Sequence, residues 1–270
     1  MAIATNREMV WIMMRAVWKA GILVAGVISI LGAARNVYAK IAAAALTEDA
    51  VTSSELANNL EALDALHGNA LTSKSLQGNG LITKTLQDPD SRELFQAIVA
   101  CALPAAKSVS VTTGNMKYTF DGRIGLTPNW GKAGGTCAAA CQEWVSACVL
   151  SELDYTGSTE EISMRGSNAA LKITEAEAGA YTVREATYYG NLFTGAKRYA
   201  CLSPGQTEIP RVCGSSLEDC PVEIDPYSTC ADLCHAPSRS GAFTDCKNIP
   251  GRQGKAFPDT ITIYLQVGEF

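Results

Sequence analysis

The sequence predicts a disulfide-rich α+β domain that is exported across a membrane. Three observations support this prediction. All ten cysteines lie after residue 100, and an uncharged apolar run stands near the N-terminus. Beyond residue 87 the chain alternates between helical and strand-like patterns. We therefore expect a single globular domain with antiparallel strands and a central cysteine-bearing helix, preceded by a short leucine-repeat linker.

Residues 1–39 resemble a signal peptide. Residues 1–19 carry three basic side chains and one acidic side chain, and the run 20–34 contains no charge. That run is shorter than the roughly 20 residues that span a bilayer, and Ala39 follows as a cleavage position. The alternative is an uncleaved anchor. Both predict that the rest of the chain is exported, to the periplasm, cell surface or extracellular space, with membrane contact only through this segment.

Residues 40–87 are predicted to form a linker of low complexity. The segment contains no Cys, Trp, Tyr or Phe, and from residue 66 a leucine recurs every five residues. The repeat consists of Leu66, Leu71, Leu76, Leu81 and Leu86. A period of five fits neither a helix nor a strand. Two interpretations stay open: a solenoid-like coil that buries one leucine per repeat, and a flexible linker with accidental spacing.

Residues 88–270 are predicted to form the cysteine-rich domain. Asp88-Pro89 supplies an N-cap and a proline at the first helical position, and Pro104 ends this helix. Residues 108–121 alternate as a hairpin with Gly114-Asn115 at the turn. The alanine-rich stretch 136–150 predicts the central helix.

The second half of the domain is predicted to be mainly strands and loops. The predicted strands are 161–166, 171–174, 186–193, 197–202 and 260–267. Thr174 with Glu177 predicts a capping box at the start of a short helix. Residues 203–259 are rich in turn residues and show little periodicity, so we expect covalent bridges to hold them.

The cysteines predict up to five disulfides, because an exported chain folds in an oxidising compartment. The candidates are Cys101, Cys137, Cys141, Cys148, Cys201, Cys213, Cys220, Cys230, Cys234 and Cys246. On a helix, Cys137, Cys141 and Cys148 would form one stripe, so we expect them to bridge to three neighbouring segments. Paired C-x-x-C spacing is missing from the cysteines after residue 212, so no metal site is predicted.

The charge of the chain argues against nucleic acid as a partner. The formal net charge is −5, and residues 1–39 are net basic, so the remaining chain is more acidic than the whole. An acidic protein repels a phosphate backbone. The expected partner is an unidentified extracellular ligand or cell-surface component.

The motif CADLCH predicts one alternative chemistry. Covalent haem attachment uses two thiols and an adjacent histidine, normally as C-x-x-C-H. Here Cys230, Cys234 and His235 have three residues between the thiols, a rarer spacing. A c-type haem at this motif, in a monohaem electron-transfer protein, is the alternative to a pair of disulfide cysteines and no cofactor.

Two further side-chain groups are candidates for function. Trp130, Arg184, Tyr188, Tyr189 and Asn191 would grip a sugar or peptide if they were exposed, and the alternative is that they pack in the core. A carboxylate-based hydrolase needs only two facing acids. The acids considered for that role are Asp121, Glu143, Glu175, Glu177 and Glu185.

Several phrases occur together in a pattern that resembles a known group of proteins. They are CALP at 101–104, IGLTPNW at 124–130, QEWVSACVL at 142–150, ISMRG at 162–166 and REATYYGNLF at 184–193. The chain resembles a family of uncharacterised exported bacterial proteins, in which Asn-Gly-Leu repeats precede a cysteine-rich domain. This chain keeps Asn79-Gly80-Leu81 but has Asn69-Ala70-Leu71 beside it. The resemblance implies export and this domain order, and it assigns no catalytic residue.

Taken from the sequence, the favoured function is a secreted or surface-exposed binding or structural protein rather than an enzyme. No G-x-S-x-G motif is present, and only His67 and His235 could serve as a histidine base. The monohaem protein and the carboxylate hydrolase are the two alternatives.

Overall fold

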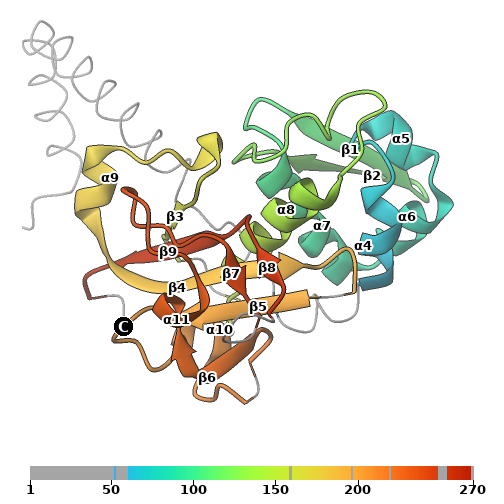
Figure 1. Ribbon diagram of the computed structural model, residues 1–270. Coiled ribbons are helices and arrows are strands. Elements are labelled where there is room, and N and C mark those ends of the chain that lie inside the picture. The colour runs from blue at the N-terminus through green and yellow to red at the C-terminus, as the bar shows by residue number, and fades with distance from the viewer. Residues whose placement is uncertain are drawn as a thin grey trace, which may run out of the picture. The chain divides into compact units, whose positions relative to one another are not determined.

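The structure is a computed structural model that describes residues 52, 60–157, 160–195, 197–218, 220–248 and 254–268. The predicted signal peptide lies outside the described residues, as does most of the segment 40–59. The chain divides into two units, 1–42 and 43–270, and the described fold belongs to the second (Figure 1). It contains helices, antiparallel strands and five disulfides, so the predicted α+β, disulfide-rich fold is confirmed.

The leucine repeat forms helices that belong to the core of the domain. Three short helices follow one another: α4 (Leu60–His67), α5 (Ser73–Gln77) and α6 (Gly80–Thr85). Thr72 and Asn79 cap α5 and α6 by accepting hydrogen bonds from backbone N–H groups. The leucines at 66, 71, 76 and 86 are buried in the main core, whereas Leu81 is 48% exposed. Residues 60–87 thus pack into the domain rather than forming a repeat coil or a flexible linker before it.

Two longer helices form the centre of this half of the molecule. Helix α7 (Pro89–Ala102) begins at Asp88, whose carboxylate accepts a hydrogen bond from the Ser91 N–H at 2.9 Å, as predicted. Helix α8 (Ala139–Ser151) packs against α7, and its residues from 142 to 151 are all buried. A helix buried on every side lies between other elements. The predicted central helix is therefore confirmed.

Strands β1 (Ser108–Thr113) and β2 (Met116–Asp121) form the predicted hairpin, with Gly114 at a φ of 58° in the turn. Glutamine side chains satisfy backbone groups on both outer edges. Gln77 donates to the Thr112 carbonyl at 2.8 Å and accepts from the Thr112 N–H at 2.7 Å. Gln96 makes the same pair of bonds to Asp121, at 3.0 and 3.1 Å. An uncovered edge is a template for strand pairing, so these glutamines protect the hairpin.

The second half of the domain is built on a five-stranded sheet in the order β3-β9-β4-β5-β6. All neighbours are antiparallel except β5 and β6, which are parallel. The strands are β3 (Ser163–Arg165), β4 (Tyr181–Asn191), β5 (Lys197–Leu202), β6 (Glu223–Thr229) and β9 (Ile261–Gln266). Figure 1 shows the C-terminal strand β9 inside the sheet, between β3 and β4.

Each face of this sheet carries a core of its own. Helix α8 packs against β4 and β9, and Tyr188 points into the main core on that side. The next residue, Tyr189, belongs to a separate cluster with Tyr199 and Phe257. Successive strand residues point to opposite faces, so this aromatic cluster lies on the far face. Short elements and loops after residue 203 cover it.

Those covering elements are small. They are α11 (Cys230–Leu233), β7 (Cys246–Lys247) and β8 (Ala256–Phe257), whereas α10 (Pro210–Cys213) packs with Val212 and Cys213 in the main core. Strands β7 and β8 pair with each other. The region is thus loop-rich, as predicted, and it depends on covalent bridges.

One strand prediction was wrong. Residues 171–174 form no strand: a 3-10 helix occupies Ala169–Leu171, and Thr174 caps α9 (Glu175–Ala180). Asn168 accepts a hydrogen bond from the Ala170 N–H, which turns the chain before a strand can start. The Thr174 hydroxyl accepts from the Glu177 N–H at 3.1 Å, as the predicted box requires. The Glu177 carboxylate accepts instead from Ser163.

All ten cysteines form disulfides. The pairs are Cys101–Cys148, Cys137–Cys141, Cys201–Cys230, Cys213–Cys220 and Cys234–Cys246. The prediction that Cys137, Cys141 and Cys148 bridge to three other segments was wrong, because Cys137 and Cys141 pair with each other. Cys137 precedes the first residue of α8, so it is free of helical spacing and its Cα lies 5.0 Å from that of Cys141.

In the part of the chain that the structure describes, no helix is long and apolar enough to cross a membrane.

Candidate functional site

The CADLCH motif lies in the loop layer that covers the aromatic face of the sheet. Cys230 is the first residue of α11 and pairs with Cys201 on β5, and Cys234 follows that helix and pairs with Cys246 on β7. We call these two disulfides the paired bridges. Haem attachment by thioether bonds needs both thiols of the motif to be free. In this structure both sulfurs are used in the paired bridges.

The His235 side chain contacts the carboxylate of Asp245. The histidine side chain is 74% exposed, and its Nδ1 lies 3.0 Å from Asp245 Oδ2. Backbone hydrogen bonding between His235 and Thr244 fixes the two loop segments beside each other. Asp245 itself has a φ of 51°. This contact connects the CADLCH motif to a group of acidic side chains.

Three carboxylates, Glu143, Asp245 and Asp259, form what we call the acidic site. Glu143 projects from α8 and is 8% exposed. Burial raises its pKa, and the nearby Asp259 raises it further, against the opposing effect of Lys255. Burial, together with Asp245, raises the pKa of Asp259 to about 6. Two neighbouring acids with raised pKa values are a recognised feature of acid–base sites, although buried structural groups show it too.

Of the five acids considered from the sequence, only Glu143 lies near another carboxyl group whose pKa is raised, that of Asp259. Glu177 accepts from Ser163, and Glu185 binds Arg211 and Tyr188, so both serve the fold. Asp121 and Glu175 lie exposed elsewhere. Sequence reasoning missed Asp245 and Asp259, because no motif connects them to Glu143, which is more than 100 residues earlier.

The predicted binding surface is wrong for four of its five residues, because Trp130, Tyr188, Tyr189 and Asn191 are buried. Trp130 Nε1 donates to the Asn69 carbonyl at 2.7 Å and so holds the α4–α5 segment. Asn191 donates to Gln142 on α8. These residues pack the interior, as their alternative interpretation had it.

The two tyrosines show why the pattern misled. Tyr188 donates to Glu185, and Tyr189 donates to the Lys247 carbonyl while stacking on Tyr199. From Glu185 to Asn191 both faces of β4 are covered, so neither alternating set reaches solvent there. Arg184 is the exception: it is half-buried, with its guanidinium 4.7 Å from the centre of the Phe243 ring.

A buried arginine that the sequence did not single out lies beside a cavity of about 230 Å³. Arg211 on α10 donates twice to the Glu185 carboxylate, once to the Tyr188 hydroxyl, and to the carbonyls of Ser151 and Leu153. A guanidinium has five N–H groups, and these five bonds use all of them. Arg211 therefore joins α10, β4 and the end of α8, and has no donor left for a ligand.

A second polar cavity, of about 350 Å³, lies between α7, β2 and the end of α8. Arg123 and Glu152 form an ion pair in its wall. Burial raises the pKa of Glu152, and Arg123 opposes that effect. The partner of each charge is again a protein group, so this cavity does not identify a ligand.

Comparison of the chain with protein-family models, curated proteins and solved structures found no match. The resemblance to exported proteins with Asn-Gly-Leu repeats stays a prediction.

Proposed function

We propose that this chain is an exported protein with a binding or structural role, acting at the cell surface or in the extracellular space. The observation that carries the proposal is that all ten cysteines form disulfides. Disulfides of this density are typical of proteins that fold in an oxidising compartment. Three of the five bridges have both ends between residues 201 and 246, where regular structure is sparse.

Strand β6 offers a candidate binding surface, whereas the tryptophan and tyrosines considered from the sequence are buried. This strand is the last in the order of the sheet, and Tyr227 on it is 96% exposed. Exposed tyrosine combines a large apolar area with a hydroxyl group, which suits recognition of an extracellular ligand or cell-surface component. Replacement of Tyr227 by Ser is the corresponding test once a ligand is found.

The first experiment is the intact mass of the native protein, with and without reduction and alkylation. We expect a chain beginning at Lys40 that gains ten alkyl groups only after reduction. Ten free thiols in the native protein would contradict export. A haem-sized adduct that survives denaturation, or a visible absorption band, would contradict the proposal in favour of the monohaem alternative.

A carboxylate-based hydrolase is the second candidate, and the acidic site supports it. Glu143 and Asp259 are neighbouring carboxyl groups whose pKa values are both raised by burial, and a raised pKa is what the general acid of such a hydrolase needs. The test is hydrolysis of a glycan panel by the wild type and by Glu143→Gln and Asp259→Asn variants. Glu175→Gln is the matched control, because Glu175 is exposed on α9.

The two candidates give different results. Turnover that falls at least about 100-fold in both acidic-site variants and not in the control would support the hydrolase. Binding to a panel member without turnover, unchanged in those variants and weakened by Tyr227→Ser, would support the binding protein.

A further inference from the structure

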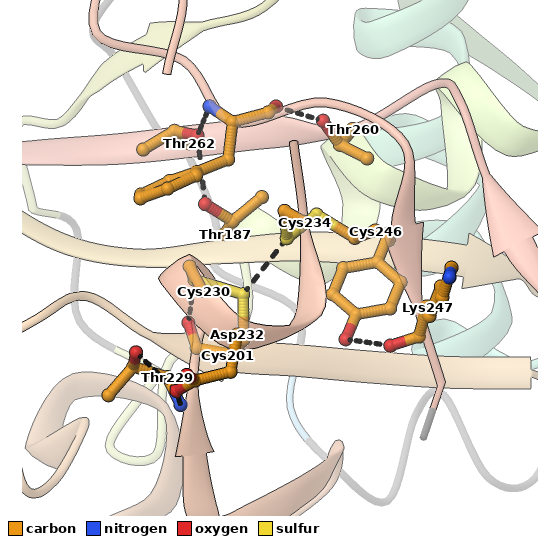
Figure 2. The surroundings of a disulfide bond; sticks show 12 residues. Thr187, Cys201, Thr229, Cys230, Asp232, Cys234, Cys246, Lys247, Thr260 and Thr262 are labelled. Carbon is orange, nitrogen blue, oxygen red and sulfur yellow. Dashed lines mark hydrogen bonds between the residues drawn. A yellow bond between two sulfur atoms is a disulfide. The ribbon is translucent and has the colours of Figure 1, made fainter. Parts of the chain in front are cut away.

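The paired bridges lie in contact with each other. Cys201 Sγ is 3.6 Å from Cys234 Sγ, although these atoms belong to different disulfides, as the dashed line in Figure 2 shows. The sulfurs of Cys201, Cys230 and Cys234 all lie within 4.8 Å of one another. Disulfide exchange starts when one sulfur attacks another. These sulfurs are already close enough for that step.

The four cysteines differ in exposure. Cys201, Cys230 and Cys246 are fully buried, and Cys234 is partly exposed. A dissolved thiol therefore reaches the paired bridges at Cys234. Attack there breaks the Cys234–Cys246 bond and leaves the Cys201–Cys230 bond intact behind it.

We propose that the paired bridges form a thiol–disulfide exchange relay that takes a low-molecular-weight dithiol as its substrate. One thiolate of the dithiol attacks Cys234 Sγ and expels the Cys246 thiolate. The second thiolate of the dithiol closes its own disulfide and expels the Cys234 thiolate. The Cys234 thiolate then attacks Cys201 Sγ, forms a Cys201–Cys234 bond and expels the Cys230 thiolate.

The electrons balance over these steps. One dithiol is oxidised to a cyclic disulfide, and one protein disulfide is reduced to two thiols. The thiols end on Cys230 and Cys246, which did not share a bridge at the start. Protons from the solvent neutralise both thiolates at neutral pH.

The structure around α11 holds the cysteines of the relay at fixed positions. Cys234 N–H donates to the Cys230 carbonyl at 3.0 Å, so α11 fixes the spacing of these two cysteines. Thr229 and Asp232 form a capping box that holds the first turn of α11. Cys230 Sγ lies 2.9 Å from the Cys201 carbonyl oxygen. After exchange, a Cys230 thiol has that oxygen as an acceptor within reach.

The proposal is tested on the wild-type protein by limited reduction with dithiothreitol, acid quenching, alkylation and peptide mapping. We expect a Cys201–Cys234 peptide pair to form, with label on Cys230 and Cys246. The Cys137–Cys141 and Cys213–Cys220 bridges are internal controls. Each contains one partly exposed cysteine, and among the described residues neither belongs to a group of three neighbouring sulfurs. Label only on Cys234 and Cys246, with Cys201–Cys230 intact at every time point, would overturn the relay.

A variant tests the last step without any reductant. Cys246→Ser leaves Cys234 as a permanent thiol beside Cys201. We expect label on both Cys230 and Cys234, and both Cys201–Cys230 and Cys201–Cys234 peptide pairs. In the matched Cys220→Ser variant, label should stay on Cys213. Label confined to Cys234 in the Cys246→Ser protein would contradict the proposal. If that variant does not fold, the wild-type experiment decides alone.

Discussion

Arg211 connects three parts of the fold through one guanidinium group. Burial and the adjacent Glu185 carboxylate raise the pKa of Tyr188, so the tyrosine hydroxyl stays protonated and donates to Glu185. Arg211 bonds both Glu185 oxygens, at 3.1 and 2.7 Å. The charge pair and the hydroxyl therefore form one buried network, in which removal of one member leaves polar atoms of the others without that partner.

We predict that Arg211→Met lowers the free energy of unfolding by about 3–5 kcal/mol, because Glu185 would remain as an unpaired buried charge. Denaturant unfolding followed by circular dichroism measures the change. The double variant Arg211→Met/Glu185→Gln should recover part of the loss, since the uncompensated charge is gone. A loss below about 1 kcal/mol in the single variant would contradict a structural role for this arginine.

The raised pKa of Asp259 predicts how the stability of the fold changes with pH. Its pKa is about 6 in the folded protein and 3.8 as the ordinary value, so the folded state binds more protons between these two values. The contribution of Asp259 to stability therefore falls as pH rises from about 4 to 6, and its ionised form opposes folding above that window.

The Asp259→Asn variant should be more stable than the wild type at pH 7, by about 1 kcal/mol after allowance for screening by water. The difference should vanish below about pH 4, where the wild-type carboxyl group is protonated in both states. Thermal unfolding of both proteins from pH 3.5 to 8 measures it. Asp121→Asn, at an exposed position on β2, is the control. A variant that is less stable at pH 7 would show that the folded state favours the ionised form.

At the scale of elements, the leucine repeat offers a sharp comparison between pattern and structure. Its leucines are equivalent in the sequence, yet Leu76 is 0% exposed and Leu81 is 48% exposed. We predict that Leu76→Ala lowers the free energy of unfolding by about 2–5 kcal/mol. Leu81→Ala should change it by about 0.5 kcal/mol or less. Equal losses in denaturant unfolding would support a repeat in which every leucine is buried alike.

Elements were predictable where local chemistry decides them. Asp88-Pro89 starts α7, Gly114 turns the hairpin, and the alternating residues of β9 form a strand, because each of these depends on neighbours in sequence. The helices at 60–86 were not predictable in this way. Helices α5 and α6 have only 5 and 6 residues, too short to be stable alone. Contacts with distant residues, such as the hydrogen bonds between Gln77 and Thr112, hold them in place.

At the scale of the whole molecule, the sequence predicted the fold class and the bridged state of the cysteines, but not the site. Cysteine number and composition can be read directly from the sequence, and a high, even cysteine count is typical of disulfide-bonded exported proteins. The acidic site needs Glu143 on α8 to meet loops more than 100 residues later, and the burial of Tyr188 and Tyr189 needs both faces of β4 to be covered. Only the folded chain brings these residues together.

The disulfides of the helical half should contribute unequally to the stability of the molecule. Cys101–Cys148 closes a separation of 47 residues and joins α7 to α8, whereas Cys137–Cys141 closes a separation of only 4. A bridge stabilises mainly by restricting the unfolded chain, and the restriction grows with the loop that it closes. Removing the first bridge should therefore cost about 4 kcal/mol and removing the second about 2 kcal/mol.

The measurement compares Cys101→Ala/Cys148→Ala with Cys137→Ala/Cys141→Ala by denaturant unfolding, with the other bridges intact. The buried position of Cys101 and Cys148 adds a loss of packing to the first variant, so the difference between the variants should be at least about 2 kcal/mol. Equal losses would mean that the unfolded chain is already compact around α7 and α8. In that case the Cys101–Cys148 bridge would add little restriction, because α7 and α8 already lie close together in the unfolded chain.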